Sequence, residues 1–495
     1  MPSEIKFGTD GWRAIIADQF TFANVRKAAQ GVAGEMLASG TAKAGAMIAW
    51  DTRFGSEKFA IATAKVLAGN GIRCVLATRP APTPAASFSV ITHKAGGGVM
   101  ITASHNSASY NGFKVKSDQG GSAPPDMVAR IEAEIERIES GEVAVQHVSL
   151  DEAQRTGLLE LFDPTAPYLE QLGHVVDLEP IKQARLKIVV ESMHGSGGGL
   201  FPRLLSGGNL ELIELHGEPN PAFPGFVQPE PIEANLGALQ AAVRENGADA
   251  GIAFDGDADR VGLVDENGRY ISTLEGFSLL AHHLLERRRQ QGTVVSTITM
   301  SSMVDRLGEA YGIDTPRTAV GFKYVGPKML ETNAIIGGEE SGGYAFRGHI
   351  PERDGLLSGL IFLEAIVSSK KRPSELLTDL FAITRPHSFR RVDVQFPEDQ
   401  RSAIQNLIET AEPGTLSGME IERSDRLDGV KYFLEGGGWG IVRLSGTEPL
   451  LRMYAEAQDV ETVNRILKDL TVTFGLYCKN PALFSMDNDA IKGGI

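Results

Sequence analysis

Short apolar segments that alternate with helix patterns constrain the fold of this chain more than any other feature. Within the first 150 residues the sequence predicts strands at 46–50, 74–77 and 98–101, and a helix that two prolines open at 124–125. Alternating strands and helices bury their apolar faces against one another, which is typical of an α/β layer architecture.

The same alternation restarts twice further along the chain. The second round predicts strands at 186–190, 211–215 and 250–254 and a helix at 233–244, and the third predicts strands at 293–298 and 335–336. After residue 372 the texture changes, with short strands between helices at 392–396, 430–434, 440–444 and 451–455. Because 495 residues are too many for one hydrophobic core, several domains are expected.

We expect an α/β protein of four domains. Three similar mixed α/β domains are predicted at 1–150, 151–266 and 267–372, and a smaller C-terminal α+β domain at 373–495. In α/β domains, functional side chains gather where strands end. We therefore expect functional residues in the segments that directly follow the predicted strands.

The charge balance limits the kinds of molecule that this chain is expected to bind. The chain has 48 Lys and Arg against 63 Asp and Glu, a net charge of −15. No nucleic acid partner is expected, because a phosphate backbone needs a basic face, but small anionic substrates need only a local cationic cluster. No uncharged apolar run is long enough to span a bilayer and the N-terminus lacks an apolar signal core, so we expect no membrane partner and a cytoplasmic location.

Three aspartates at alternate positions, Asp255, Asp257 and Asp259, directly follow the predicted strand at 250–254. Such concentrated negative charge costs free energy unless a cation neutralises it, and ligation by oxygen alone suits a hard ion such as Mg²⁺. An EF-hand calcium loop is a rival, because Glu266 stands twelfth counting from Asp255, but the sixth position is not glycine and the flanks are predicted strands. A solvated acidic turn is the alternative without chemistry.

Ser104 and His105 follow the predicted strand at 98–101, and Lys114 comes ten residues after the serine. A bare serine is a poor nucleophile, and no G-x-S-x-G elbow surrounds Ser104, which argues against a serine hydrolase. A phosphorylated serine beside Mg²⁺ would instead be a phosphoryl donor, with His105 and Lys114 supplying cations for its oxygens. The alternative is a polar turn that satisfies its own backbone.

Residues 443–449 combine an arginine with a tight Ser-Gly-Thr turn, and Arg452 follows downstream. Hydroxyls, approachable backbone N–H groups and forked guanidinium donors all match phosphate oxygens. The segment therefore predicts a phosphate site, with a polar hairpin turn as the alternative.

Residues 338–343 place adjacent carboxylates and a hydroxyl between glycines. Carboxylates accept hydrogen bonds from vicinal sugar hydroxyls, although a flexible acidic loop has the same composition. Lys323, His349 and Arg353 offer cationic groups in the same predicted domain, although His349 could equally be a surface histidine. Near the N-terminus, Arg13 could reach a phosphate or pair with Asp10.

Taken together, these segments closely resemble the α-D-phosphohexomutase superfamily, the phosphoglucomutases and phosphomannomutases. The motifs T-A-S-H-N, D-G-D-x-D-R, G-E-x-S-G and R-x-S-G-T occur once each and in the order of the family. The resemblance spans nearly the whole chain. It implies four domains around a central cleft, the last with a TATA-binding-protein-like fold.

The resemblance also implies a role for each segment. Ser104 would be the phosphoserine, with its phosphate on Mg²⁺ held by Asp255, Asp257 and Asp259. His105 and Lys114 would act near the proton transfers, and Arg13 would bind the phosphoserine. The implied substrate-binding residues are Glu339, Ser341, Lys323, Arg443, Ser445, Gly446, Thr447 and Arg452.

The implied reaction interconverts hexose 1-phosphate and hexose 6-phosphate through a bisphosphorylated sugar. Glucose is the first choice of hexose and mannose the second, with glucose 1,6-bisphosphate as activator. A phosphoglucosamine mutase, a non-catalytic sugar-phosphate-binding relative and a phosphatase are the alternatives. One departure stands out: the family usually has proline after S-H-N, where this chain has Ser107, which puts the rigidity of the loop in question.

Overall fold

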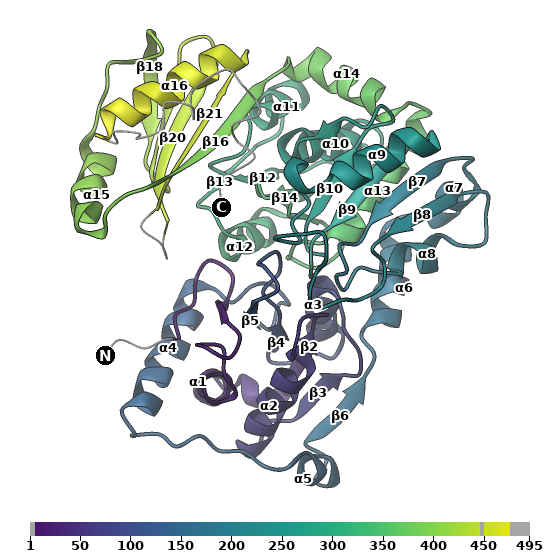
Figure 1. Ribbon diagram of the computed structural model, residues 1–495, viewed down its shortest axis with the longest axis vertical. Helices are drawn as coiled ribbons and strands as arrows, with labels where there is room; N and C mark the ends of the chain where they lie inside the picture. The colour runs from purple at the N-terminus through teal and green to yellow at the C-terminus, as the bar shows by residue number, and fades with distance from the viewer. Residues whose placement is uncertain (1–4, 446–449, 476–495) are drawn as a thin grey trace. The chain divides into compact units, whose positions relative to one another are not determined.

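Strands and helices alternate through residues 5–445 and 450–475, the part of the chain that this computed structural model describes (Figure 1). The predicted strands at 46–50, 74–77, 98–101 and 250–254 are confirmed with the predicted bounds. The chain divides into two units. Unit 1 runs to Val295 and resumes over Gly321–Thr378, and unit 2 consists of Ser296–Val320 and the chain from Asp379 onward.

The first sheet of unit 1 has the strand order β1-β5-β4-β2-β3-β6. Its strands are β1 (Trp12–Ile15), β2 (Ala46–Trp50), β3 (Cys74–Ala77), β4 (Gly98–Ile101), β5 (Tyr110–Lys116) and β6 (Leu159–Phe162). Neighbours among β4, β2, β3 and β6 are parallel, whereas β5 pairs antiparallel with β4 and β1. The prediction of a loop over 102–114 is therefore wrong from Tyr110 onward, because the chain turns back and adds a strand.

Side chains of this sheet alternate between two apolar layers. Ile48 and Val99 pack in one core with the helices α1 (Phe22–Ser39), α2 (Ser56–Gly69) and α4 (Pro125–Glu139). Met47 packs on the other face with α3 (Thr83–Thr92). Two further short elements, η1 (Thr41–Ala44) and α5 (Leu150–Arg155), complete this part of the chain. Because both faces of the sheet are buried, the ends of its strands are held in position. The strand β4 ends directly before the loop of Ser104.

The second sheet has the order β11-β10-β9-β7-β8. Its strands are β7 (Lys187–Glu191), β8 (Glu211–Leu215), β9 (Ala250–Phe254), β10 (Val261–Val264) and β11 (Tyr270–Ile271), and its helices are α6 (Thr165–Val175), α7 (Leu178–Gln183), α8 (Leu200–Leu205) and α9 (Gly237–Asn246). The predicted helix at 233–244 is displaced, because η2 (Glu233–Asn235) precedes α9 and the Asn235 side chain donates to the backbone of Gln228 and Glu230. The turn between the antiparallel β9 and β10 carries the aspartates.

The rest of unit 1 surrounds a hairpin. Its elements are α10 (Thr273–Glu286), α12 (Phe322–Thr332), β14 (Ile336–Gly338), β15 (Tyr344–Phe346) and α13 (Gly355–Ser369). The helix α14 (Pro373–Thr384) starts in unit 1 and ends in unit 2. A capping box of Ser272 and Glu275 begins α10. The antiparallel β14 and β15 flank residues 339–343, so the predicted sugar loop is the turn of a hairpin.

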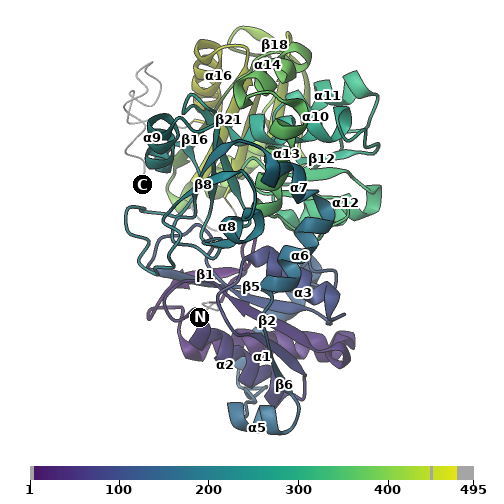
Figure 2. The same ribbon diagram turned by 90° about the vertical axis from the view of Figure 1, so that its right-hand side faces the viewer.

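Unit 2 contains an antiparallel sheet with the order β16-β21-β20-β19-β18-β17. Its elements are β12 (Val294–Thr297, which starts in unit 1), α11 (Met303–Tyr311), β13 (Arg317–Thr318), β16 (Ser388–Gln395), η3 (Glu398–Gln400), α15 (Arg401–Thr410), β17 (Thr415–Leu416), β18 (Met419–Asp425), β19 (Val430–Leu434), β20 (Trp439–Leu444), β21 (Leu450–Ala457) and α16 (Val460–Thr473). Figure 2 shows α16 beside β21. Residues of α15 and α16 pack in one apolar core against one face of this sheet. Ile298 packs on the other face with Trp439 and Tyr454. The predicted C-terminal α+β fold is confirmed.

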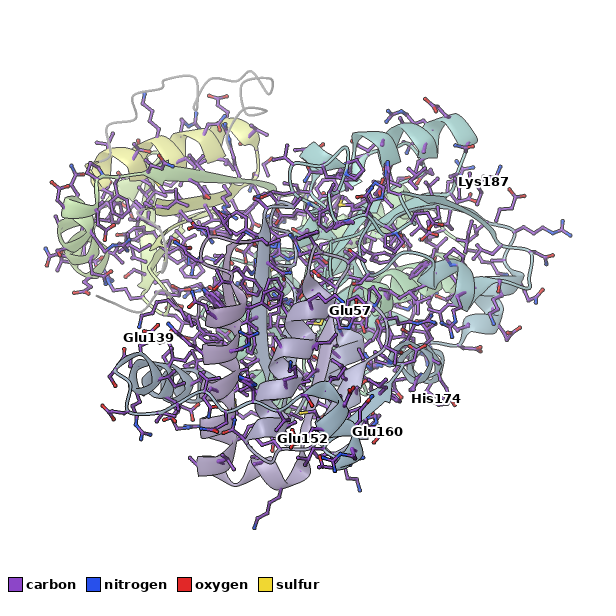
Figure 3. The ribbon with its side chains drawn as sticks, turned by 60° about the horizontal axis from the view of Figure 1, so that its bottom comes forward. Glu57, Glu139, Glu152, Glu160, His174 and Lys187 are labelled. Carbon is purple, nitrogen blue, oxygen red and sulfur yellow. The ribbon has the colours of Figure 1, made fainter. Side chains whose placement is uncertain are left out.

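The acidic excess includes side chains on the outside of unit 1. Glu57 on α2, Glu139 on α4 and Glu152 on α5 are exposed (Figure 3). Within the described ranges, no helix is both long and apolar enough to cross a membrane.

A buried polar cluster joins α6 to the start of α13. The hydroxyl of Tyr168 donates to both carboxylate oxygens of Asp354, at 2.9 and 3.0 Å. Asp354 also accepts from the backbone N–H of Leu357 at 2.8 Å and lies 2.9 Å from His349 Nε2. Both His349 and Asp354 are almost completely buried, so His349 is a structural residue rather than a surface histidine.

We predict that Tyr168→Phe destabilises unit 1 by about 1.5–3 kcal/mol, because it removes a buried hydrogen bond to a charged acceptor. Burial and the charge of Asp354 hold the pKa of Tyr168 well above its usual value, so this hydroxyl remains a donor at neutral pH. Differential scanning calorimetry measures the effect. Tyr324→Phe, at a 37% exposed tyrosine, is the control and should change stability by less than about 0.5 kcal/mol. Equal stability of both variants would show that the cluster contributes nothing.

Candidate active site

The turn after β4 presents Ser104. Its backbone N–H donates to Thr102 Oγ1 at 2.9 Å, and its φ of 51° lies in the left-handed region that serine rarely adopts. The residue is buried, and its Oγ donates to Asp255 Oδ2 at 2.8 Å. The predicted phosphate carrier therefore touches the first predicted metal ligand.

The predicted metal ligands form one buried cluster. Asp255, Asp257 and Asp259 each offer an oxygen, and these oxygens lie within 4.8 Å of one another. Asp255 Oδ1 accepts from the backbone N–H of Asp259 and Arg260, at 3.0 and 3.1 Å, which holds the turn in shape. Within the described residues, Asp257 Oδ1 and Asp259 Oδ1 are buried without a hydrogen-bond partner, which is rare in a protein interior. Unpartnered buried carboxylate oxygens fit a hard divalent cation.

Glu266 takes no part in this cluster. Its carboxylate accepts hydrogen bonds from the hydroxyl of Ser374 and, at 3.3 Å, from the backbone N–H of that residue. The residue that an EF-hand would use as its twelfth ligand is thus engaged elsewhere, and the strands β9 and β10 flank the turn. The structure contradicts the EF-hand alternative.

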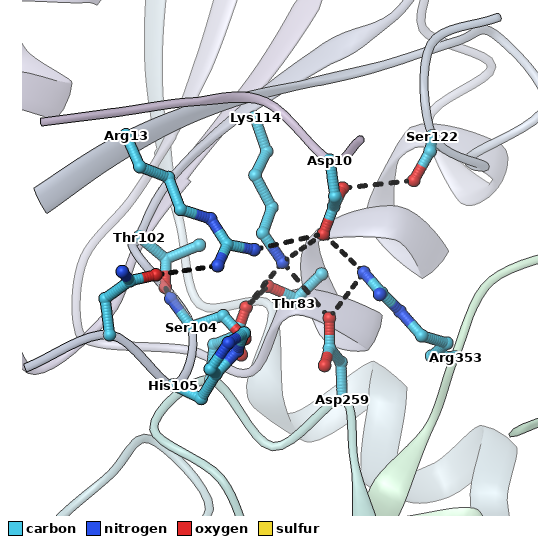
Figure 4. A network of polar contacts seen from close by, with 12 residues as sticks. Asp10, Arg13, Thr83, Thr102, Ser104, His105, Lys114, Ser122, Asp259 and Arg353 are labelled. Carbon is cyan, nitrogen blue, oxygen red and sulfur yellow. Dashed lines mark hydrogen bonds and ion pairs between the residues drawn. The ribbon is translucent and has the colours of Figure 1, made fainter. Parts of the chain in front are cut away.

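Two cationic side chains neutralise the carboxylates (Figure 4). Lys114 Nζ lies 2.9 Å from Asp257 Oδ2 and 3.1 Å from Asp259 Oδ2. It also lies 2.8 Å from Asp10 Oδ2. Arg353 Nη2 lies 2.9 Å from Asp259 Oδ2 and pairs with Asp10 as well. Burial alone would lower the pKa of Lys114, but the surrounding carboxylates raise it above that of a free lysine, so Lys114 is an ammonium group.

The pKa values of Asp255 and Asp257 are shifted in opposite directions. Burial raises the pKa of Asp255 well above its usual value, and the charges of Asp257 and Asp259 act in the same direction. Burial also acts to raise the pKa of Asp257, but Lys114 and a 2.6 Å hydrogen bond from Thr83 Oγ1 lower it overall. A divalent cation would favour the ionised form of all three.

His105 lies between the serine and a carboxylate of the second domain. Its Nδ1 is 3.3 Å from Ser104 Oγ, and its Nε2 is 4.0 Å from Glu230 Oε1. Arg260 Nη1 holds the same Glu230 oxygen at 2.6 Å. Burial, together with Arg260 and Arg13, lowers the pKa of His105 well below its usual value, so the imidazole is neutral at neutral pH.

Arg13 lies on β1 and reaches the serine loop. Its Nη1 donates to Asn106 Oδ1 at 2.7 Å, and its Nη2 lies 3.8 Å from Asp10 Oδ2. The two roles weighed for Arg13, pairing with Asp10 and approach to a phosphate on Ser104, are thus compatible (Figure 4).

The hairpin turn of the predicted sugar loop holds a buried carboxylate. Burial raises the pKa of Glu339 to about 7, although Arg353, at 3.4 Å, acts in the opposite direction. Gly343 makes room for Arg353, because a Cβ atom there would lie 2.2 Å from Arg353 Cδ. Ser341 is half-buried in the same turn. Lys323 lines a small cavity together with Asp10.

Unit 2 carries the predicted phosphate loop at the end of β20. Arg443 and Arg452 face each other across the β20–β21 ladder. Arg443 Nη2 lies 2.9 Å from Asp428 Oδ2, and the backbone N–H of Ser445 donates to Leu450 O at 2.8 Å. Gly446 and Thr447 lie outside the described residues. Two arginines opposite each other repel, and an anion beside them would relieve that repulsion.

Sequence reasoning did not assign a role to three buried residues of the site. The sequence links Asp10 only to Arg13 and offers Arg353 only as a nearby cation, but together they join Lys114 on β5 to the turn of Asp259. Arg53, beneath the serine loop, was not singled out at all. A usable signal was the Asp-Thr-Arg segment directly after the strand at 46–50, since strand ends position functional side chains.

Four family models match the chain. They are described as Phosphoglucomutase/phosphomannomutase alpha/beta/alpha domain I at residues 4–142, domain II at 166–268 and domain III at 275–383, and the C-terminal domain of the same family at 406–471.

Relatives match over nearly their full length. A phosphoglucomutase/phosphomannomutase of Thermococcus kodakarensis is 32% identical, covering 93% of this chain and 96% of its own. A phosphoglucosamine mutase of Marinomonas sp. is 30% identical, covering 94% of this chain and 96% of its own. A crystal structure from Thermus thermophilus has a TM-score of 0.81 at 33% identity, covering 95% of this chain and 99% of its own. The chain therefore belongs to the phosphoglucomutase/phosphomannomutase family of the α-D-phosphohexomutase superfamily, whose members are phosphomutases that transfer a phosphate group intramolecularly.

Proposed function

We propose that this phosphomutase interconverts hexose 1-phosphate and hexose 6-phosphate through phosphorylated Ser104 and a bisphosphorylated sugar. The observation that carries the proposal is the 2.8 Å contact between Ser104 Oγ and the buried carboxylate of Asp255. A phosphate on Ser104 would be repelled by this cluster unless a divalent cation lay between them. The serine and the aspartates therefore support one site rather than two.

In the proposed cycle, a sugar hydroxyl attacks the phosphorus on Ser104 and the bond from Oγ to phosphorus breaks. The resulting bisphosphate then returns its other phosphoryl group to Ser104 Oγ. Arg13 and Lys114 supply positive charge for the oxygens of the transferring group. His105, with its lowered pKa, is suited to accept the proton of the attacking hydroxyl, whereas Lys114, with its raised pKa, is suited to keep its positive charge beside the transferring group.

The donor set supports Mg²⁺ as the resident metal. Asp255, Asp257, Asp259 and a phosphate on Ser104 would hold it, and it would neutralise charge on the transferring phosphoryl group. Asp257 Oδ1 and Asp259 Oδ1 accept no hydrogen bond from the residues that the structure describes, which supports this assignment.

Two other loops are proposed to hold the sugar phosphate. Glu339 and Ser341 would bind sugar hydroxyls, with Lys323 nearby. The non-reacting phosphate is assigned to Arg443, Ser445, Gly446, Thr447 and Arg452. The facing arginines of β20 and β21 support an anion site in unit 2.

Among hexoses, we propose glucose first and mannose second, with glucose 1,6-bisphosphate as activator and phosphoglucosamine mutase activity as the alternative. The relatives include both a phosphoglucomutase/phosphomannomutase and a phosphoglucosamine mutase. Glu340, rather than glutamine, stands between Glu339 and Ser341, which favours the glucose-type branches by resemblance.

We predict that Ser104→Ala lowers kcat by about 10³-fold or more, because it removes the hydroxyl beside Asp255 that is proposed to carry the phosphoryl group. A coupled assay with Mg²⁺ and a trace of glucose 1,6-bisphosphate measures the interconversion of glucose 1- and 6-phosphate. Ser109→Ala, at an exposed serine of the same loop, is the control and should leave kcat unchanged. Release of free phosphate without isomerisation would contradict the proposal, and parallel assays with mannose and glucosamine phosphates decide the substrate.

Removal of metal with EDTA should abolish turnover but leave the chain folded, because Lys114 and Arg353 already neutralise the buried aspartates. Added Mg²⁺ should raise the thermal unfolding midpoint of the wild type, since a ligand that binds only the folded state stabilises it. In Asp259→Asn, the Mg²⁺ concentration for half of this rise should increase about 10-fold or more. Glu266→Gln is the matched control, and an equal Mg²⁺ response of both variants would move the metal site elsewhere.

Glu339→Gln should increase stability and decrease activity. Because the folded-state pKa is about 7 against a usual value of 4.5, the folded state holds a proton that the unfolded chain loses. The free energy of unfolding therefore falls as pH rises from about 4.5 to about 7, and a neutral glutamine escapes this loss by up to about 3 kcal/mol.

Urea unfolding at pH 5 and pH 8 measures the difference. The variant should be the more stable protein at pH 8 and close to wild type at pH 5, with a raised KM for the hexose phosphate. Glu57→Gln on the exposed face of α2 should change stability by less than about 0.5 kcal/mol at both pH values. A Glu339→Gln variant that is no more stable at pH 8 would show that the buried carboxylate carries no penalty.

A further inference from the structure

The loop that carries Ser104 has few internal hydrogen bonds that would fix its conformation. Ser107 stands where the resemblance leads one to expect proline, and serine does not fix φ as the proline ring does. Inside the loop, Asn106 N–H donates to Ala103 O at 3.0 Å, and Tyr110 N–H donates to Ser107 O at 3.1 Å. Ser104 nevertheless adopts a φ of 51°, and such strained backbone persists only where the surroundings enforce it.

Arg53, in the turn after β2, holds this loop from outside by hydrogen bonds. Its Nη1 donates to Ser107 O at 2.7 Å and to Tyr110 O at 3.0 Å. Its Nη2 donates to Ser104 O at 2.6 Å and to Asn106 O at 2.5 Å. One guanidinium group therefore gathers four carbonyl groups of the loop.

Arg53 is itself fixed by two neighbours. Its Nε lies 3.2 Å from Asp51 Oδ2, an oxygen that also accepts from Thr102 Oγ1 at 2.6 Å. Its guanidinium carbon lies 4.9 Å from the ring centroid of the buried Phe223, which comes from the second domain. Because the guanidinium is clamped between a carboxylate and a ring, it can impose its own geometry on the loop.

We propose that Arg53 is a positioning residue for phosphoryl transfer: its fork sets the backbone of 104–107 and thereby directs Ser104 Oγ toward Asp255. This inference rests on the proposed phosphoserine role of Ser104. Phosphoryl transfer needs the attacking oxygen, the phosphorus and Oγ in line, and a displacement of about 1 Å can cost about 10²-fold in rate. Arg53 contacts the backbone oxygen of Ser104 and not Oγ, so it acts through the loop.

Lysine cannot replace this arrangement. A lysine keeps the positive charge beside Asp51 but carries its donors on one nitrogen, so it cannot span carbonyl groups on both sides of a fork. Arg53→Lys therefore removes the forked donors but keeps the positive charge. The carbonyl groups of Ser107 and Tyr110 are the ones that would lose a donor first.

The test compares Arg53→Lys with wild type on the hexose phosphate that wild type turns over, well below the unfolding temperature of either. We expect kcat to fall about 10- to 100-fold while KM stays within about threefold, because the sugar loops are untouched. Hydrogen–deuterium exchange should rise in residues 103–110 and stay unchanged in α13.

Arg288→Lys is the matched control, because Arg288 makes a forked ion pair with Glu364 far from the serine in sequence, at 2.9 and 2.5 Å. It should keep wild-type kcat. If Arg53→Lys does not fold, Phe223→Leu takes its place, with an expected fall in kcat of about 3- to 10-fold and the same rise in exchange.

A folded Arg53→Lys with wild-type kcat would overturn the inference, as would a fall in kcat without increased exchange in residues 103–110. Failure of the proposed function looks different. In that case wild type would turn over no hexose phosphate, while unchanged exchange in Arg53→Lys would still refute the role of Arg53 in holding the loop.

Discussion

The structure of the site depends on the balance of charge around three buried aspartates. Asp255, Asp257 and Asp259 are fully buried within one turn, and their mutual repulsion would disfavour this turn without nearby cations. Lys114, on β5, supplies one cation, and Arg353, before α13, supplies another. These partners come from parts of unit 1 far apart in sequence, so charge neutralisation ties those parts together.

The same balance explains why the site is ready for an anion as well as a cation. Ser104 lies against Asp255, and Arg13 lies within reach of the serine loop through Asn106. A divalent metal would add positive charge where one oxygen each of Asp257 and Asp259 lacks a hydrogen-bond donor among the described residues, and a phosphate on Ser104 would add negative charge beside it. Positive and negative groups in this arrangement suit phosphoryl transfer, which relies on charge neutralisation and alignment more than on covalent chemistry of the protein.

Rigidity in the serine loop comes from outside the loop. The resemblance leads one to expect proline after the S-H-N segment, and this chain places Ser107 there. The four carbonyl contacts of Arg53 restrict the same backbone by hydrogen bonding instead of by a ring. Asp51 and Phe223 hold Arg53, so the turn after β2 and a loop of the second domain both contribute to the position of Ser104.

The sequence by itself determined the α/β class and most strand positions, and it singled out Ser104 and the three aspartates as candidate site residues, because these depend on local periodicity and on residue types that have few uses. It missed β5, since a strand completed by pairing with β4 and β1 has no apolar run of its own. Only the tertiary structure decided that Asp10, Arg353 and Arg53 belong to the site and that Glu266 and His349 do not. Partners of buried charges are chosen by distance in space, and spacing along the chain carries no record of that distance.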